Sequence, residues 1–493
     1  MRGSGILLPI ASLPSKYGIG SFSKEAYWFV DQLKAAGQKY WQILPLGPTG
    51  YGDSPYQSFS TFAGNPYYID LEEFIEKGYL SRQECDECDF GDEEESIDYE
   101  RVYKSRFILL KKAFQSGMKE DEEEWKHFVK KNEYWLNDYA LYMAIKDQYD
   151  GLSWLNWEED IRLRKSKAIK EYSESLANEI KFYQFLQFIF HNQWRNLKKY
   201  ANQNGVKIIG DIPIYVALDS ADCWANTKLF QFNKDNIPIA VAGCPPDAFS
   251  ETGQLWGNPL YDWQQHVKTE FNWWIQRVKY SFKLYDVVRI DHFRGFDEYY
   301  SIPYGEETAI NGHWESGPGY HLFKSLSHKL GELDIIAEDL GMLTNNVRQL
   351  LKKTGYPGMK VLQFAFNAED ESDYLPHNYN KNCVVYTGTH DNNTTKGWYE
   401  SLSEADRQYT ISYLDNKTKN KKDISWDFIR LAMSSVARIC IIPLQDYLGL
   451  GSEGRINTPS TLGDNWGWRM RQDELNKDIV LRINEMTKLY GRK

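Results

Sequence analysis

Short runs of apolar, often β-branched residues recur along the chain, and longer amphipathic segments separate several of them. The apolar runs lie at residues 6–10, 40–46, 206–216, 286–293, 334–340, 359–366, 382–391 and 436–444. Their length and composition are typical of buried strands, whereas the spacing of apolar residues over 23–36 predicts a helix. Strands that alternate with helices indicate parallel βα units. Eight such units predict an α/β fold, a TIM (β/α)8 barrel.

Two long interruptions of this pattern predict insertions after the second and third strands. Residues from about 65 to 205 are mostly helical, charged and aromatic in pattern, so we expect an inserted, mainly helical subdomain. Residues from about 217 to 285 begin with a segment rich in Gly, Pro and aromatic residues and end in a helical pattern. We expect an inserted loop and helix subdomain there. Residues 1–493 then form a single catalytic barrel domain.

The fourth predicted strand, residues 286–293, carries charges inside an apolar run. Because side chains alternate along a strand, Val287, Arg289 and Asp291 share one face. Val288, Ile290 and His292 share the other face. An Arg and an Asp side by side on an apolar face are costly unless they are paired or functional. The pair therefore indicates either a buried ion pair that fixes packing or a catalytic group at a strand end.

Carboxylates occur at the ends of four predicted strands: Asp211, Asp291, Glu338 and Asp391. In a barrel all four meet at one rim, where their charges repel and the pKa of at least one should rise. Glycoside hydrolysis uses two carboxyl groups, one as nucleophile or base and one as proton donor. Arg289, two residues before Asp291, should keep Asp291 ionised as the nucleophile. Glu338 is then the acid/base, kept protonated by its neighbours' charge.

Composition adds limits on partners and location. Aromatic residues make up 15% of the chain, with 17 Trp and 34 Tyr, which favours a carbohydrate ligand or a large aromatic core. The net charge of −11 argues against nucleic acid or an anionic membrane as partner.

The first apolar run is too short for a signal peptide, and no run has the length of a membrane span. Six scattered cysteines predict free thiols in the cytoplasm. Cys85 and Cys88 have the spacing of half a zinc site, without a second half.

Several motifs resemble a known family. Residues 288–295 (VRIDHFRG), 336–341 (IAEDLG) and 386–391 (YTGTHD) look like the nucleophile, acid/base and third-carboxylate regions of the α-amylase clan. The closer resemblance is to the amylomaltases, which are 4-α-glucanotransferases. It rests on residues 4–9 (SGILLP), 47–56 (GPTGYGDSPY) and 463–466 (GDNW), and it extends through nearly the whole chain.

This resemblance implies roles for individual residues. It implies Asp291 as nucleophile, Glu338 as general acid/base and Asp391 as stabiliser of the distorted sugar. It places four further residues around the subsite where cleavage occurs: Arg289, His292, His390 and Asp211. Asp211 is followed by Ile-Pro-Ile-Tyr-Val, as in the amylomaltases, and not by the Asn-His pair of many amylases. This departure argues against an ordinary amylase and against the calcium site that many amylases hold. We therefore expect no metal and no cofactor.

Transfer requires a sugar hydroxyl to compete with water, and residues 251–259 (ETGQLWGNP) are candidates to favour it. Gly253 and Gly257 should make this segment mobile, so that it closes over the rim. Trp256 offers a stacking platform and Gln254 a hydrogen-bonding group. The alternative is that the Trp only pins the segment to the barrel. Two weaker candidates for sugar contacts are Tyr56 and Phe364.

These observations predict a 4-α-glucanotransferase that moves α-1,4-glucan segments between chains, or to glucose, by a retaining double displacement. A retaining α-glucan hydrolase is the alternative among enzymes. A catalytically inactive glucan-binding protein is disfavoured because all three carboxylates are present. The pattern GLGSEG at residues 449–454 resembles a dinucleotide-binding motif, but Pro459 and a further Gly-rich stretch follow it where a helix should begin. Maltooligosaccharides and glucose are the expected partners, and the chain is expected to be a monomer or homodimer.

Overall fold

The computed structural model describes residues 2–50, 52–117, 122–246, 250–341, 343–369, 372–415, 424–461 and 463–493. Residue 51 of the motif 47–56 lies outside the described residues, as do residues 247–249 of the second predicted insertion. No helix in the described ranges is both long and apolar enough to cross a membrane.

Eight parallel strands of the described chain form one sheet that closes almost completely into a barrel. These are β1 (Gly3–Leu7), β2 (Tyr40–Gln42), β3 (Lys207–Pro213), β6 (Val287–Asp291), β9 (Ile335–Ala337), β10 (Gly358–Val361), β11 (Cys383–Tyr386) and β12 (Ile439–Pro443). Their order is β10-β11-β12-β1-β2-β3-β6-β9, so neighbours in the sheet follow one another around the barrel. The N–H of Ala337 donates to the Pro357 carbonyl at 3.0 Å and links β9 to the start of β10. The predicted TIM barrel is confirmed.

Some strand boundaries differ from the prediction. The first strand was expected at residues 6–10, but β1 covers residues 3–7 and Ile10–Ser12 form a 3-10 helix. Pro9 lies between them and has no N–H to donate to a neighbouring strand. The sixth strand, expected at 359–366, ends at Val361, where the 3-10 helix Leu362–Phe364 begins. The apolar runs therefore continue past the strands into buried turns at the rim.

The alternation predicted for residues 287–292 decides what faces the barrel interior. Val287 belongs to an inner apolar cluster, together with Ile209 of β3 and Val384 of β11. Val288 and Ile290 belong to the larger cluster between the strands and the surrounding helices. The inner cluster fills the barrel below the carboxylates, so the charged side chains lie above an apolar floor.

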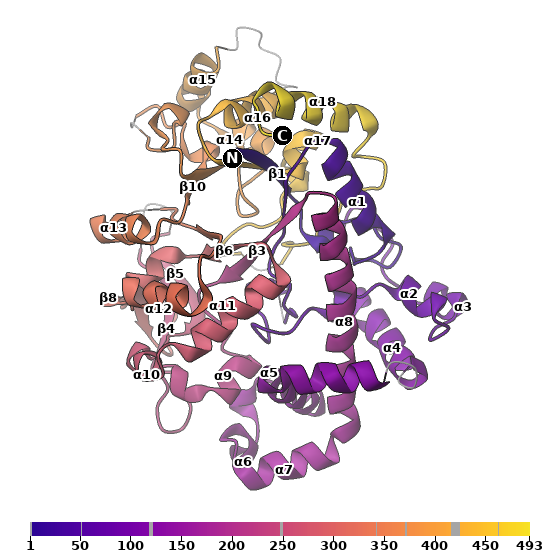
Figure 1. The fold of residues 1–493 in the computed structure, drawn as a ribbon. Coiled ribbons are helices and arrows are strands. Elements are labelled where there is room, and N and C mark those ends of the chain that lie inside the picture. The colour runs from indigo at the N-terminus through magenta and orange to yellow at the C-terminus, as the bar shows by residue number, and fades with distance from the viewer. Residues whose placement is uncertain are drawn as a thin grey trace.

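Helices surround the barrel and fill the first insertion. They are α1 (Lys24–Ala35), α2 (Leu71–Glu76), α3 (Arg82–Asp86), α4 (Tyr99–Gly117), α5 (Glu122–Gln148), α6 (Glu159–Arg162), α7 (Ser166–Ser175), α8 (Ala177–Gln203), α9 (Ala221–Ala225), α10 (Trp263–Lys268), α11 (Asn272–Leu284), α12 (Tyr320–Leu330), α13 (Asn345–Thr354), α14 (Thr395–Ser401), α15 (Glu404–Tyr413), α16 (Ile424–Ser434), α17 (Leu444–Leu448) and α18 (Lys477–Leu489). The long helix α8 runs beside the barrel, and the two termini lie close together (Figure 1). Arg492 donates to the Gly3 carbonyl at 3.1 Å, which ties the two ends of the chain.

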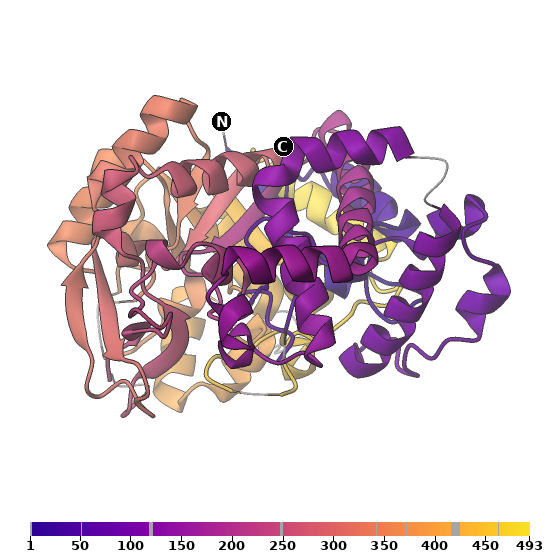
Figure 2. The same ribbon diagram turned by 90° about the horizontal axis from the view of Figure 1, so that it is seen from below.

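A second sheet, which the sequence did not predict, lies beside the barrel. It has the order β5-β4-β7-β8 and is antiparallel, formed by β4 (Ala240–Cys244), β5 (Gln254–Pro259), β7 (Glu298–Pro303) and β8 (His313–Ser316). Two of these strands follow β6, so the segment beyond the fourth barrel strand packs onto the segment beyond the third. This sheet and helices α2–α4 lie on opposite sides of the barrel (Figure 2). The boundaries predicted for the insertions, 65–205 and 217–285, stay predictions.

The glycine pattern at 449–454 does not open a helix. Gly449 ends α17 in the left-handed conformation (φ 70°), and Ser452–Gly454 form a 3-10 helix. A dinucleotide site needs the glycines at the start of a long helix, so the local structure gives no support to that alternative.

Candidate active site

The four carboxylates predicted from strand ends lie at the carboxyl end of the barrel. Asp211 is in β3 and Asp291 ends β6, while Glu338 directly follows β9 and Asp391 follows β11. In the β3–β6 register, Asp211 is opposite Arg289. This pairing places the arginine between two carboxylates, one on its own strand and one on the neighbouring strand.

Arg289 joins two of the carboxylates. Its guanidinium donates to Asp211 Oδ2 at 2.6 Å and to Asp291 Oδ1 at 2.8 Å. The Arg289 and Asp211 side chains are buried, with 3% and 0% exposed, whereas Asp291 is 30% exposed. Burial opposes the charge of Arg289, but the carboxylates of Asp211 and Asp291 raise its pKa well above the ordinary value. One buried cation therefore neutralises the deep Asp211 and holds the more exposed Asp291 in a fixed orientation.

Glu338 is held by backbone groups from two chain segments. The N–H of His292 donates to Oε2 at 2.7 Å, and the N–H of Leu340 donates to Oε1 at 2.8 Å. His292 can present its N–H there because it adopts the left-handed conformation, with φ of 52°, an uncommon conformation that often occurs at functional sites. Burial, followed by the charge of Asp291, raises the pKa of Glu338 to about 8. The neighbouring charges that were expected to cause this rise contribute less to it than burial does.

Asp391 has different surroundings. Its Oδ2 lies 3.2 Å from Nε2 of His390, and its Oδ1 accepts from the Asn457 amide at 2.6 Å. Burial acts to raise the pKa of Asp391, but His390 and Asn457 outweigh it and lower the pKa to about 2. The pKa of His390 is raised, because the Asp391 charge outweighs burial. Asp391 is therefore ionised where Glu338 is protonated.

An aromatic network connects these groups on the side of the barrel that carries residues 47–56. The Tyr56 hydroxyl donates to Asp211 Oδ2 at 2.8 Å and lies 2.9 Å from His390 Nε2. The Tyr56 and His390 rings stack at 5.2 Å, and the Trp466 ring lies 5.9 Å from that of Tyr56. Tyr56 and His390 thus lie among the carboxylates, and their contacts with a sugar stay a prediction.

Trp256 and Gln254 lie on the other side of the site, near His292. The Trp256 ring is perpendicular to that of His292, with centroids 4.8 Å apart, and its indole N–H donates to Gln254 Oε1 at 3.0 Å. Residues 254–259 form the edge strand β5, so the expected open, mobile loop is wrong for this part of 251–259. The ladder between β4 and β5 shifts register near Trp256, between the pair Gly243–Leu255 and the pair Val241–Pro259. A bulge of this kind redirects a side chain, here toward His292.

Phe364 is set apart from this group. It lies in the 3-10 helix after β10, is 44% exposed, and packs edge-on against Tyr374 with centroids 5.6 Å apart. Among the described residues, Phe364 contacts Tyr374 and Ser372, neither of which is a catalytic candidate. Its part in sugar binding stays a prediction.

Sequence reasoning missed two residues of the site. Asn457 bonds directly to Asp391, and Trp466, with φ of 65°, lies beside Tyr56 and His390. Both come from the irregular segment after β12, where no strand or helix periodicity marks positions. The only signal was the motif 463–466, which resembles the family without indicating a contact.

The described residues around the site include a groove and no cluster of metal-binding side chains. In the described ranges, no group of three or more His, Cys, Asp or Glu is placed to hold a metal ion. Residues 48–50, 52 and 53 line a groove of about 980 Å³, which has several tyrosines in its wall, among them Tyr67, Tyr99 and Tyr103. The Tyr99 hydroxyl donates to the Trp466 carbonyl at 2.9 Å, which links the groove wall to the site.

Known proteins resemble this chain over its whole length. A family model described as 4-alpha-glucanotransferase matches residues 8–475. A 4-alpha-glucanotransferase of Clostridium butyricum is 50% identical over 485 residues, which cover 98% of this chain and 99% of that protein. A 4-alpha-glucanotransferase of Streptococcus pneumoniae is 49% identical, and the match covers 100% of this chain and 97% of that protein. The solved amylomaltase of Streptococcus agalactiae, in complex with acarbose, superposes with a TM-score of 0.97 at 40% identity and covers 100% of both chains.

Proposed function

The chain belongs to the 4-alpha-glucanotransferase family, and from that premise we propose which residues carry out the transfer. The enzyme moves segments of α-1,4-glucan between chains, and the hydrolase alternative is not supported. The single observation that carries the assignment of roles is the contrast between two neighbouring carboxyl groups. Asp291 is ion-paired to Arg289 at 2.8 Å, and Glu338 is half-buried with its pKa raised to about 8.

Asp291 is the nucleophile in this proposal. Its Oδ1 accepts from a guanidinium that remains charged at any working pH, which fixes the orientation of the carboxylate. At 30% exposure its other oxygen is accessible. Attack of that oxygen on C1 of a glucosyl unit forms a covalent ester while the C1–O4 bond to the leaving chain breaks.

Glu338 is the general acid and then the general base. As the C1–O4 bond breaks, the protonated carboxyl gives its proton to O4 of the leaving chain. The resulting carboxylate is stabilised by the N–H groups of His292 and Leu340. In the second step it takes the proton from the 4-hydroxyl of the acceptor, whose oxygen attacks C1 and releases Asp291. One glycosidic bond is broken and one is made.

Asp391, Asp211, His390 and Tyr56 bind the sugar at the cleavage point. Asp211 Oδ1 and His390 Nδ1 are both buried and have no hydrogen-bond partner within the described residues. Buried polar atoms without partners are costly unless a ligand satisfies them, and sugar hydroxyls have the matching donors and acceptors. Asp391, ionised and fixed by Asn457, stabilises the positive charge that develops on the ring.

Trp256, with Gln254 and His292, forms the acceptor side. Burial lowers the pKa of His292 to about 4, so its ring is neutral and able to hydrogen-bond with a hydroxyl. The Trp256 face gives an apolar surface for a sugar ring and excludes water from the intermediate. We further propose that glucose serves as an acceptor. The six cysteines, all free in the structure, support a cytoplasmic location, and the enzyme acts as a monomer or homodimer.

Incubation with pure maltotriose tests this function. Transfer predicts free glucose together with a ladder of longer chains, and it predicts nearly constant total reducing ends because bonds are exchanged. The function would be wrong if reducing ends rose steadily and no chain longer than maltotriose formed. The nucleophile assignment fails separately if Asp291→Asn keeps wild-type activity.

A further inference from the structure

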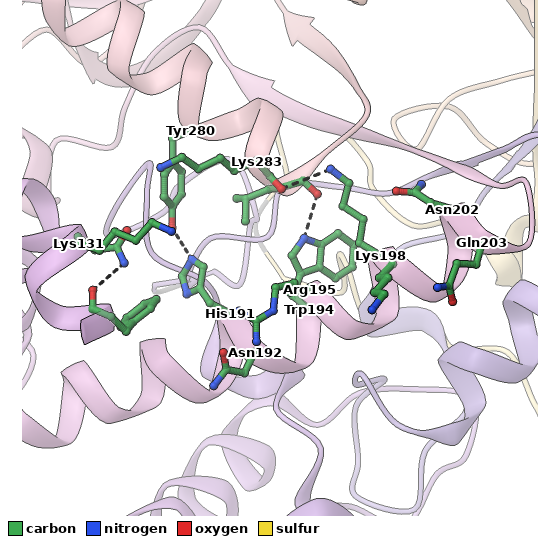
Figure 3. Close-up of a pocket in the computed structure, with 14 residues that line it drawn as sticks. Lys131, His191, Asn192, Trp194, Arg195, Lys198, Asn202, Gln203, Tyr280 and Lys283 are labelled. Carbon is green, nitrogen blue, oxygen red and sulfur yellow. Dashed lines mark hydrogen bonds between the residues drawn. The ribbon is translucent and has the colours of Figure 1, made fainter. Parts of the chain in front are cut away.

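A groove of about 600 Å³ lies on the outer surface of α8, between α5 and α11. Aromatic residues from three helices line it: Phe128 of α5, His191 and Trp194 of α8, and Tyr280 of α11 (Figure 3). Its volume lies within the range of small-molecule sites. None of the catalytic candidates lines it, and the proposed function gives it no role.

Positive charge is concentrated around this groove. Its cationic lining residues are Lys131, Arg195, Lys198, Lys199 and Lys283, and no Asp or Glu is among the described residues that line it. This is unexpected in a chain with a net charge of −11. Burial, followed by the like charges of Lys131 and Lys279, lowers the pKa of Lys283. The cations therefore repel one another in the free protein, and an anion would relieve this repulsion.

Only one of the lining cations has a clear structural task. Lys198 donates to the Tyr285 carbonyl at 2.9 Å and lies 3.4 Å from Asp286. By contrast, Lys131, Arg195, Lys199 and Lys283 make no ion pair with any residue that the structure describes. Lys283 lies 5.4 Å from the centroid of the Tyr280 ring. Lys131 lies close enough to Lys283 for its charge to contribute to the lowered pKa of Lys283.

The apolar floor is fixed without these cations. His191 bonds to the Gln187 carbonyl at 2.6 Å and to the Tyr280 hydroxyl, and burial lowers its pKa to about 4, so its ring is neutral. The Trp194 indole donates to the Leu284 carbonyl at 3.0 Å. Because the floor packs on its own hydrogen bonds, Lys131 and Lys283 are not needed to hold it together.

We propose that this groove binds a phosphate monoester carried on a ring, such as a sugar phosphate or a nucleoside monophosphate. The ammonium groups of Lys131 and Lys283, which both line the groove, would hold the phosphate dianion, and the Arg195 guanidinium could donate further hydrogen bonds. The aromatic floor suits the face of a ring, and the amide of Asn192 suits a hydroxyl group. A concave site of this size favours a small ligand over an anionic polymer, which would need an open, extended patch.

The groove lies at the end of the barrel opposite the catalytic rim. Lys198 binds the carbonyl of Tyr285, two residues before β6 begins, whereas Asp291 is the last residue of β6. At about 3.3 Å per residue, the strand alone separates the two ends by about 13 Å. A ligand in the groove should therefore not compete with glucan, and the proposal holds or fails independently of the catalytic roles.

Calorimetric titration of the full-length enzyme at low salt tests the proposal with glucose 1-phosphate, adenosine monophosphate, inorganic phosphate and glucose as separate probes. We expect saturable binding of at least one phosphomonoester, weaker binding of inorganic phosphate and none of glucose at this site. The variant Lys131→Gln/Lys283→Gln should bind the phosphomonoester at least tenfold more weakly and keep the wild-type KM for maltotriose. The preferred phosphomonoester identifies the ring that the floor accepts.

A matched control removes the same charge elsewhere. Lys352 and Lys353 are exposed on α13 and make no ion pair with a described residue, so Lys352→Gln/Lys353→Gln should bind within twofold of wild type. The proposal is overturned by undetectable binding of both phosphomonoesters, by equal binding in the Lys131→Gln/Lys283→Gln variant, or by competition of the phosphomonoester with maltotriose. The proposal would also be overturned if the wild type bound glucose and the Lys131→Gln/Lys283→Gln variant did not, because the groove would then be a site for neutral sugar.

Discussion

Raising the pH from 7 to 9 should inactivate the free enzyme by removing the proton from Glu338. With a pKa of about 8, the protonated fraction is about 0.9 at pH 7 and about 0.1 at pH 9, because each pH unit beyond the pKa changes the ratio tenfold. The acid must carry its proton to protonate the leaving chain, so kcat/KM should fall about tenfold over this interval. A carboxyl at its ordinary pKa of 4.5 would already be almost fully ionised at pH 7.

The measurement is the initial rate of glucose release from maltotriose, well below KM, between pH 5 and pH 10. Far-UV circular dichroism at each pH confirms that the protein stays folded. The Glu338→Gln variant is the control, since any residual rate should show no basic limb. A midpoint of the basic limb below pH 6, or no fall up to pH 10 in folded protein, would refute the assignment of Glu338 as a buried acid.

Three further changes test the surroundings of the site. Asn457→Ala removes the 2.6 Å bond to Asp391. Loss of about 1.5–3 kcal/mol from the transition state should lower kcat/KM about 10- to 150-fold, and calorimetry checks that the variant stays folded at the assay temperature. Glu338→Gln should melt at a higher temperature than wild type. Its advantage should grow from pH 5 to pH 8, since a raised carboxyl pKa removes stability as pH rises through that window; equal pH dependence of the two melting curves would count against a raised pKa. Trp256→Ala should raise the share of hydrolysis, seen as reducing ends gained per glucose released, and an unchanged share would leave Trp256 as a packing residue.

Sequence periodicity was sufficient to predict the barrel because buried strands have a simple signature. The alternation over residues 287–291 predicted that Arg289 and Asp291 share one face of the strand. In the structure this face, with Val287, is turned to the barrel interior, and the register with β3 places Asp211 opposite the same arginine. Parallel barrel strands bring their carboxyl ends together at one rim, and this rule placed Glu338 and Asp391 near Asp211 and Asp291.

The features of the fold and the site that the sequence did not predict depend on contacts between residues far apart in the chain. The sheet of β4, β5, β7 and β8 joins segments on either side of β6, and its short strands lack a strong alternating pattern. The edge strand carrying Trp256 was therefore expected to be a mobile loop. Asn457 contacts Asp391 across 66 residues from an irregular segment, so no local periodicity indicates it. The largest cause of the raised Glu338 pKa, burial, likewise follows from packing and not from residue order.

Trapping the covalent intermediate tests the central claim most directly. The enzyme is incubated with a slow fluorinated glucosyl donor, digested, and examined by peptide mass spectrometry. We predict one added glucosyl unit on the peptide that contains Asp291, absent in Asp291→Asn. A label on the peptide that contains Glu338 would contradict the assigned roles.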